Sequence, residues 1–399
     1  MSKQLVIVGG ARTAMAEFSG TPGYGLFKTV TANDLGAHAI KAALERSNVK
    51  PEQVDHVVMG NVLQTSACAI YGARHASLKA GLANEVPAVT VNRICGSGIQ
   101  SVVSAAHMIM AGEASVVVAG GMENMSQAPH VMRGGRDGFR FGAPPKMEDM
   151  LFESLMDPYI GMFMAQTAEK LAVEYGISRE AQDEYALRSH QLGAAAVKNG
   201  VFADEIAPMT VKAGRKEFVV DTDDHIRPET TIEGLQRLRA AFGKDGTVTA
   251  GNASGIVDGG AALIITTADR AAAEGWTVRA NIRSWGIAGV DPTVMGFGPV
   301  PSMKQAAERA GVAIGDIDYI EINEAFSAQY LACEKALELD REKCNVNGGA
   351  VAIGHPLGAT GTRLLLTLMH QLEISGKSTG MASACIGGGQ GIAMMIDRP

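Results

Sequence analysis

The stretch VNRICGSGIQS, residues 91–101, places a cysteine on a turn between an apolar strand and a helix. The run AVTV precedes Cys95, and apolar residues recur at helical spacing from Ile99 to Met110 after it. A thiol there lies near the backbone N–H groups and the dipole of a helix N-terminus, which stabilise an anion. We therefore expect a lowered thiol pKa at Cys95 and a side chain that could act as a nucleophile.

Two other interpretations of this turn stay open when it is taken alone. GSGIQS is close to the GxGxxG fingerprint of dinucleotide sites but lacks the third glycine. A buried cysteine also needs no chemical role, because free cysteine behaves as a small hydrophobe. The rest of the chain favours the nucleophile.

Three more motifs carry residues that could act with a thiolate. NGGAVAIGHPLGATGTR places His355 in a glycine- and proline-rich loop before an apolar helix, and loops carry function. ACIGGGQG places Cys385 after an apolar strand and before a turn that can offer a backbone N–H to an oxyanion. EINEAFSAQ puts Asn323 and Glu324 at the end of a buried strand, a common site position in α/β sheets.

Composition limits the class of protein and its partners. The chain has 399 residues and a net charge of −7, from 35 basic and 42 acidic residues, which argues against nucleic acid as the main partner. The five cysteines are widely spaced without a CxxC pair, so we expect neither a disulfide framework nor a metal site. We find no apolar run near the ~20 residues of a membrane helix and no signal-like start, so we expect no membrane contact and a cytoplasmic location.

Segments in the two halves of the chain repeat one another in the same order. ERSNVKPEQVDHV (45–57) matches ERAGVAIGDIDYI (308–320), and ASVVVAGG (114–121) matches ASACIGGG (382–389). A looser match pairs residues 91–92 with residues 346–347, each before a glycine-rich turn and a helix. The repeats indicate a duplicated α/β unit with a mainly parallel sheet in each copy, and a site where the copies meet.

The segment 122–249 has a different composition from the two repeats. Residues 122–164 hold eight of the 20 methionines, which suit either a loosely packed core or a soft surface for an acyl tail or a partner subunit. The predicted domains are therefore an N-terminal half, 1–121 with 250–275, an inserted domain, 122–249, and a C-terminal half, 276–399.

At these residues the sequence resembles the thiolases, that is, acetyl-CoA acetyltransferases and 3-ketoacyl-CoA thiolases. NRICGSGIQS, NEAFSAQ, NVNGGAVAIGHPLGATG and CIGGGQG follow one another as in that family, and GTVTAGNASGIVDGGAA precedes the second half. The resemblance spans almost the whole chain. It implies an α/β thiolase fold of duplicated, five-layered α-β-α-β-α halves with a loop domain inserted in the first half.

The resemblance also implies roles for the motif residues. Cys95 corresponds to the nucleophile that becomes acylated, His355 to the base that activates it, and Cys385 to a second cysteine that moves a proton at the α-carbon of acetyl-CoA. Asn323, holding a water, and His355 would form one oxyanion hole, and the backbone N–H groups of Cys95 and Gly387 a second.

Further positions correspond to substrate-binding residues of the family. Ser254 falls near the pantetheine arm of CoA, Ala250 lies in the same motif, and Phe242 and Arg227 fall where the loop domain contacts the adenine and its phosphates. Acetoacetyl-CoA-specific members commonly have His-Met near the acyl group, whereas this chain has Phe163-Met164. That departure leaves the preferred acyl length open.

The resulting prediction is an acetyl-CoA C-acetyltransferase that works through an acyl-Cys95 intermediate. It would condense two acetyl-CoA to acetoacetyl-CoA plus CoA, or cleave a 3-ketoacyl-CoA by thiolysis. The alternatives are a broad or longer-chain degradative 3-ketoacyl-CoA thiolase and a non-catalytic acyl-CoA-binding subunit. CoA would be a substrate, no cofactor is expected, and the family implies a homo-oligomer, a dimer or a dimer of dimers, with a tetramerisation loop near 122–150.

Overall fold

The computed structural model describes residues 4–213, 215–243 and 245–399. Its main sheet has the order β14-β15-β16-β13-β1-β12-β5-β3-β4, and β2 pairs with β12 beside this path. The strands are β1 (Leu5–Arg12), β2 (Ala16–Glu17), β3 (His56–Gly60), β4 (Ala88–Val91), β5 (Val117–Glu123), β12 (Val257–Thr267), β13 (Ala280–Gly289), β14 (Tyr319–Ile322), β15 (Thr379–Ile386) and β16 (Gln390–Asp397).

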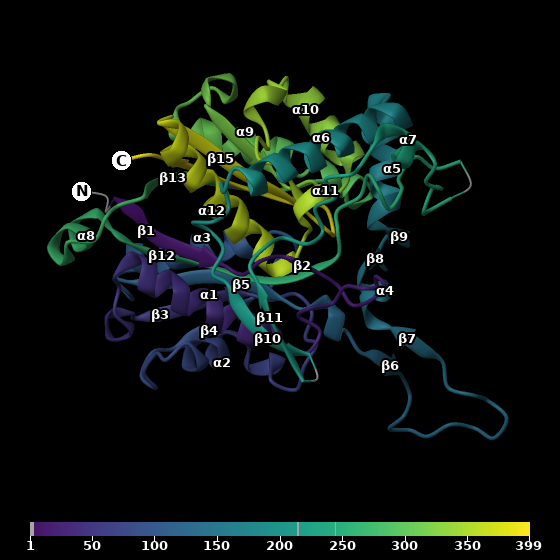
Figure 1. Cartoon of the computed structure of the whole chain (residues 1–399), viewed down its shortest axis with the longest axis horizontal. Coiled ribbons are helices and arrows are strands. Elements are labelled where there is room, and N and C mark those ends of the chain that lie inside the picture. Colours follow the sequence, from purple (N-terminus) through teal and green to yellow (C-terminus); the bar gives the residue numbers. More distant parts are fainter. Residues whose placement is uncertain (1–3, 214, 244) are drawn as a thin grey trace.

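Five layers follow from where the apolar residues pack. Helices α3 (Ser97–Ala111) and α12 (Leu357–Ser375) share one core with strands from both ends of the sheet path, so they lie between the two halves of the sheet (Figure 1). Helices α1 (Ala32–Ser47) and α2 (Gly72–Lys79) cover the outer face of the first half. Helices α9 (Pro299–Ala310) and α10 (Ser327–Leu337) cover the second half, which confirms the expected five-layered fold.

The two central helices approach each other through glycines. A Cβ atom on Gly98 would lie 2.3 Å from the backbone nitrogen of Thr362, and one on Gly361 would lie 2.4 Å from that of Ile99. Contacts this short exclude any side chain, so the start of α3 and the first turns of α12 pack backbone to backbone. The loops that precede the two helices, with Cys95 and His355, are therefore brought together.

In the part of the chain that the structure describes, the α3 region alone resembles a membrane helix by length and hydropathy. Among the described residues, the window 94–111 is apolar and long enough, but 56% of it is buried inside the molecule. A core helix of an α/β fold passes the same test, because it is apolar on all sides.

The internal repeat corresponds to matching elements. One copy gives the end of α1, then η1 (Pro51–Gln53) and β3, and the other gives the end of α9, then η5 (Ile314–Asp316) and β14. The repeated aspartates make the same contact: Asp55 accepts from two amides just before β5, at 2.7 and 2.9 Å, and Asp318 from two amides at the start of β15, both at 3.0 Å. Each aspartate thus ties together two neighbouring parallel strands.

The expectation of mainly parallel strands is wrong. In the described part of the chain, β3 runs parallel to β4 and β5, and β14 runs parallel to β15, but the other pairings of the main sheet are antiparallel. Strand β16 follows β15 through a tight turn in which Gly388 and Gly389 have φ of 82° and 83°. Such a hairpin makes its strands antiparallel, and the predicted α/β alternation had no signal for it.

The chain leaves the sheet after Glu123 and returns to it at Val257. Between them lie η3 (Met125–Gln127), β6 (His130–Met132), β7 (Met147–Asp149), α4 (Met150–Ser154), β8 (Met156–Asp157), β9 (Met162–Phe163), α5 (Met164–Tyr175), α6 (Arg179–Lys198), β10 (Met209–Ala213), β11 (Lys216–Val220) and α7 (Ile232–Gln236). Buried Arg12 on β1 anchors this segment through Glu205 and Asp223, each at 2.8 Å. The predicted domain boundaries stay a prediction.

The remaining elements are η2 (Ala69–Tyr71), α8 (Ala268–Glu274), η4 (Pro292–Phe297), η6 (Arg341–Lys343) and α11 (Ala350–Ile353).

Candidate active site

Cys95 lies in the short connection between β4 and α3. The residue before it, Ile94, has φ of 47°, a left-handed conformation that is rare for a β-branched residue. Ser97 holds this turn, because its hydroxyl donates to the carbonyl of Ile94 at 2.7 Å. The turn presents Cys95 to a cavity of about 340 Å³ that His355 and Gly387 also line.

Desolvation dominates the acidity of Cys95. It raises the pKa of the thiol to about 12, and the carboxylate of Glu123 acts in the same direction, while a hydrogen bond from the Gly387 backbone opposes both. The expectation of a lowered thiol pKa is therefore wrong. Helix α3 begins only at Ser97, with Gly96 as its N-cap, so the thiol lies outside the first helical turn. Cys95 rests as a thiol and needs a base.

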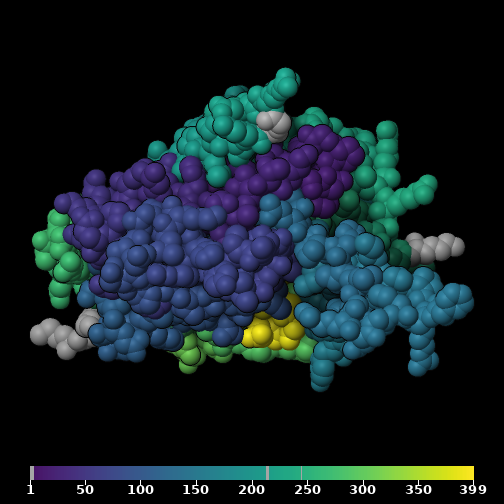
Figure 2. All heavy atoms as spheres, turned by 90° about the horizontal axis from the view of Figure 1, so that it is seen from below, coloured from purple at the N-terminus to yellow at the C-terminus, as the bar shows by residue number. Residues whose placement is uncertain are grey.

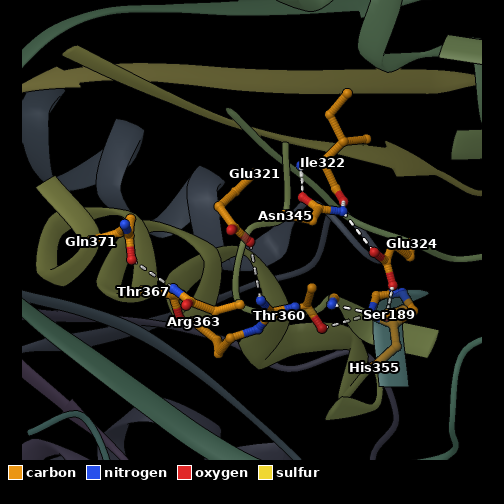
Figure 3. Close-up of polar contacts among 12 residues, drawn as sticks. Ser189, Glu321, Ile322, Glu324, Asn345, His355, Thr360, Arg363, Thr367 and Gln371 are labelled. Atoms are coloured by element: carbon orange, nitrogen blue, oxygen red, sulfur yellow. Dashed lines mark hydrogen bonds and ion pairs between the residues drawn. The ribbon is translucent and has the colours of Figure 1, made fainter. Parts of the chain in front are cut away.

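His355 is held at both ring nitrogens (Figure 3). Its Nδ1 lies 2.6 Å from the hydroxyl of Thr360, which itself donates to the carbonyl of Pro356 at 3.0 Å and so accepts the Nδ1 proton. Nε2 is then unprotonated and faces the side-chain nitrogen of Asn323 at 3.3 Å. Burial, with the charge of Arg363 second, lowers the pKa of the ring to about 3. His355 is a neutral imidazole with Nε2 as the basic atom.

We expect Thr360→Val to lower kcat/KM by roughly 10- to 100-fold. Valine keeps the volume but offers no acceptor for the Nδ1 proton, so the ring loses its fixed tautomer and orientation. Steady-state kinetics, with a thermal melt to confirm folding, measure the effect. Thr360→Ser restores the hydroxyl and should recover most of the rate; a folded valine variant with parental kcat/KM contradicts the assigned tautomer.

Asn323 and Cys385 come from neighbouring strands of the second half. The backbone amide of Asn323, just after β14, donates to the carbonyl of Ser383 on β15 at 2.9 Å. Its side-chain oxygen is buried and has no partner among the described residues, which leaves it free for a water or a substrate group.

Cys385 lies behind the wall of the inner cavity. It is fully buried against Met295 and Ala325, which do line the cavity. Burial raises the pKa of Cys385 well above the usual value, and the nearby Cys95 raises it further. The two cysteines thus influence each other's ionisation, and the structure brings Cys95, His355, Asn323 and Cys385 together from both halves of the chain.

A second cavity, of about 730 Å³, adjoins the first. The residues that line both are Leu155, Met164, Ser254, Gly255, Ile256 and Phe326. The outer cavity is also lined by the remaining predicted CoA-binding positions, Phe163, Arg227, Phe242 and Ala250. The two cavities form a passage that suits a long ligand with its reactive end at Cys95.

Arg227 already has partners within the protein. Its guanidinium bonds the carboxylate of Glu17 at 2.5 Å, lies 4.5 Å from the ring centre of Tyr24 and bonds that ring's hydroxyl. Glu17 also bonds Nδ1 of His225 at 2.9 Å. Arg227 therefore presents an oriented and partly neutralised donor to the outer cavity, rather than an isolated charge.

Phe163 is not among the residues that line the inner cavity with Cys95. It lines the outer cavity, where its ring centre is 4.8 Å from that of Phe152 and 5.2 Å from that of Phe242. Met164, the next residue, lines both cavities and packs beside Cys385. The side chain near the expected acyl position is thus the methionine, and the phenylalanine belongs to an aromatic wall of the outer cavity.

Two buried carboxylates support the site without lining the inner cavity. Glu324 follows Asn323 in the sequence and accepts four hydrogen bonds (Figure 3). The donors are Tyr185 and Ser189 at 2.7 Å, Asn345 at 2.9 Å and the amide of Val351 at 3.1 Å. Glu324 thus ties the end of β14 to α6 and α11. The second carboxylate is that of Glu123, at the end of β5, which the sequence motifs did not indicate. The sequence feature that could have pointed to it is an acidic residue directly after the buried run VVAGGM.

Known proteins resemble this chain along its whole length. The family model for the thiolase N-terminal domain matches residues 5–269, and that for the thiolase C-terminal domain matches 276–398. The chain is 50% identical over 372 residues to the 3-ketoacyl-CoA thiolase, mitochondrial, of Homo sapiens, covering 93% of this chain and 94% of the relative. It is 50% identical over 397 residues to the acetyl-CoA acetyltransferase of Escherichia coli, covering 99% of each.

Solved structures agree with the sequence comparisons. The human mitochondrial 3-ketoacyl-CoA thiolase, 48% identical, has a TM-score of 0.97 and covers 100% of this chain and 99% of its own. The same human enzyme in complex with CoA has a TM-score of 0.95 and covers 100% and 98%. The chain therefore belongs to the thiolase family and is an acyltransferase with thiolase activity.

Proposed function

We propose that this enzyme cleaves 3-ketoacyl-CoA with CoA and, in reverse, condenses two acetyl-CoA to acetoacetyl-CoA, through an acyl-Cys95 intermediate. The observation that carries the proposal is the continuous passage from Arg227 and Phe242 to Cys95 and His355. The names of the relatives and the human structure with CoA support the same substrate class.

In the cleavage direction, Nε2 of His355 takes the Cys95 proton as the sulfur bonds to the 3-keto carbon. The bond between C2 and C3 then breaks, its electron pair stays on C2 as the enolate of acetyl-CoA, and the thiol of Cys385 protonates C2. The sulfur of CoA next attacks the acyl-Cys95 carbonyl and gives its proton to Cys385. The Cys95 sulfur leaves and regains its proton from His355.

Two sets of donors stabilise the oxyanions of this sequence. In our proposal the N–H groups of Cys95 and Gly387 serve the acyl carbonyl at Cys95, while protonated His355 and a water held by Asn323 serve the thioester oxygen of the enolate. The second transfer, from Cys95 to CoA, exchanges one thioester for another with little change in bond energy. The buried position of Cys385 keeps it protonated until an enolate is present.

The inner cavity favours the broader-chain candidate. Its volume of about 340 Å³ exceeds the need of an acetyl group, and apolar side chains form much of its wall, including Met125, Leu155, Met156, Pro158 and Leu357. An acyl tail gains about 0.8 kcal/mol for each CH₂ that it buries there. The cavity thus supports a degradative 3-ketoacyl-CoA thiolase that also accepts acetoacetyl-CoA.

A series of 3-ketoacyl-CoA substrates of increasing length tests both candidates. We expect CoA-dependent cleavage to extend past acetoacetyl-CoA, with kcat/KM retained or raised by a few added carbons. Met156→Trp, which fills the inner cavity, should lower kcat/KM for the longer substrates roughly tenfold or more and leave acetoacetyl-CoA nearly unchanged. Parental activity confined to acetoacetyl-CoA establishes the acetyltransferase instead; no activity on any substrate overturns the proposal.

We also propose that the enzyme is a dimer through strand β4 and a dimer of dimers through the segment 133–146. Strand β4 is the last strand of the sheet. Val89 on this strand exposes 39% of its surface, and Ile70 and Tyr71, which lie beside it, expose 72% and 57%. An uncovered apolar edge of this kind invites pairing with a second copy. Segment 133–146, between β6 and β7, forms a long loop that extends beyond the other elements (Figure 1), in the part of the surface that bulges outward at the right of Figure 2, and it exposes Phe139 and Phe141. The mass in solution tests both contacts.

The remaining proposals concern cofactors and location. Thioester exchange and enolate chemistry need only the thiols, the imidazole and the oxyanion donors, so we expect full activity after treatment with a chelator. In the described residues no cluster of three or more His, Cys, Asp or Glu side chains is arranged to hold a metal. The cytoplasmic location stays a prediction that cell fractionation tests.

A further inference from the structure

Helix α12 begins directly after His355 and has no capping side chain of its own. Its N-cap is Pro356, which provides no side-chain acceptor. The first amides of a helix have no partner within it and need acceptors from elsewhere. One of them, the amide of Gly358, donates at 2.9 Å to Oε2 of Glu123, at the end of β5 in the other half of the molecule.

Glu123 is fully buried and accepts four hydrogen bonds. Its Oε1 accepts from the side chain of Asn61 and the amide of Leu63, both at 3.0 Å. Its Oε2 accepts from the amide of Val62 at 3.1 Å, in addition to that of Gly358. One carboxylate thus joins the loop after β3 to the first turn of α12.

The backbone segments around Glu123 are in direct contact with one another. A Cβ atom on Gly121 would lie 1.9 Å from the carbonyl oxygen of Gly358, and one on Gly358 would lie 2.9 Å from that of Gly60. The start of α12 therefore rests directly on the ends of β3 and β5. Leu63 and Leu357, next to the bonded amides, belong to an apolar cluster against which Cys95 packs.

We propose that Glu123 is a positioning residue of the thiolase reaction: its carboxylate caps the helix that follows His355 and holds the start of that helix against the strand ends beside Cys95. The negative charge suits a helix N-terminus, where the dipole is positive. In this way one acidic side chain fixes the base and the nucleophile, which come from different halves of the chain, relative to each other.

The charge of Glu123 also acts on Cys95, which provides a signature separate from position. Burial, with the charge of Asp258 on β12 adding to it, raises the pKa of Glu123 to about 7. Ionised Glu123 raises the pKa of the Cys95 thiol. The other ionisable groups at Cys95 are Cys385, whose pKa lies well above its usual range, and His355, whose pKa is about 3. Of the groups at Cys95, Glu123 is the one that changes charge near pH 7; Asp258, which acts on Glu123, has its own pKa raised to about 6 by burial.

The test compares Glu123→Gln with the parent in the rate of Cys95 alkylation by iodoacetamide, followed by mass spectrometry of the Cys95 peptide. Loss of the charge lowers the Cys95 pKa, so above about pH 8 the variant should react roughly three- to tenfold faster. Below about pH 6 the parental Glu123 is protonated, and the ratio of the two rates should fall to about one. Thiolysis should show kcat lowered roughly tenfold or more with the KM for CoA little changed.

Glu324→Gln is the matched control. It also removes a buried carboxylate with four partners beside the same site, but Glu324 is not among the groups that shift the Cys95 pKa. We expect Glu324→Gln to change the rate of Cys95 alkylation, relative to the parent, by the same factor at every pH. An unchanged kcat in the folded variant overturns the positioning role, and a Glu123→Gln ratio that is also constant with pH overturns the effect of the Glu123 charge on Cys95.

If Glu123→Gln does not fold, the pH dependence of Cys95 alkylation in the parent tests whether Glu123 acts on Cys95. As Glu123 ionises, the thiol becomes harder to deprotonate, so the parental alkylation rate should rise by clearly less than tenfold per pH unit around pH 7 and by tenfold on either side. A uniform tenfold rise per unit from about pH 5 to 9 shows that Glu123 does not act on Cys95.

Discussion

We expect Cys95→Ala to abolish turnover, with kcat/KM lowered by roughly 10⁴-fold or more, because the acyl group then has no sulfur to bond. Both directions should stop, since in the proposed mechanism condensation and cleavage pass through the same acyl-Cys95 intermediate. The loss extends to the exchange of labelled CoA into acetyl-CoA, which needs only the acyl transfer to and from Cys95. Steady-state assays and the isotope exchange measure the two losses side by side.

Cys385→Ala is the matched control for this result. It removes the proton donor for C2 but leaves the nucleophile and His355 in place. We expect cleavage and condensation to fall by roughly 10³-fold or more. The exchange of CoA into acetyl-CoA forms no enolate, so His355 can carry the proton between Cys95 and CoA, and this exchange should stay within about tenfold of the parent. If Cys385→Ala loses both reactions equally, the separate roles of the two cysteines are wrong.

We expect His355→Ala to lower kcat/KM by roughly 10³- to 10⁴-fold. Because the Cys95 thiol has a pKa of about 12, hardly any thiolate exists at neutral pH without a base to take the proton. The variant must rely on hydroxide or on rare spontaneous ionisation, so its rate should climb with pH far into the alkaline range, toward the thiol pKa. The parent lacks this climb, since its imidazole, with a pKa of about 3, is already a neutral base at neutral pH.

The pH profile of kcat/KM measures this difference, and exogenous imidazole provides a control. A small base that enters the emptied position should recover part of the rate in His355→Ala and change nothing in the parent. A variant with the pH profile of the parent would show that another group takes the Cys95 proton.

Neutral Cys95 and neutral His355 are what a desolvated site favours. A thiolate–imidazolium pair would place two charges in apolar surroundings, at a cost that the protein offsets only with strong partners. In this site the hydroxyl of Thr360 and the amide of Asn323 are neutral partners, and the buried charge of Arg363 disfavours the imidazolium. Proton transfer therefore accompanies attack on the substrate, whose carbonyl oxygen takes up the new negative charge.

The sequence alone determined the family and the duplication, and it predicted a set of reactive side chains. Local motifs carry this information, because a nucleophile turn, a histidine loop and a glycine turn each need particular residue types in consecutive positions. The repeat at Asp55 and Asp318 predicted two matching α/β units, and both aspartates make the same contact in the structure. The repeat also indicated that the segment 122–249 is an insertion, because this segment interrupts the repeated pattern.

Tertiary structure decided the features that depend on residues far apart in the chain. The thiol pKa of Cys95 rises because desolvation and Glu123 outweigh the hydrogen bond from the Gly387 backbone, and no local pattern reports desolvation. Side-chain direction puts Met164, not Phe163, at the inner cavity. The cap of α12 comes from Glu123, 235 residues away from Gly358 along the chain. Hydrogen bonds and burial act through space, so their outcome is set only once the two halves have packed against each other.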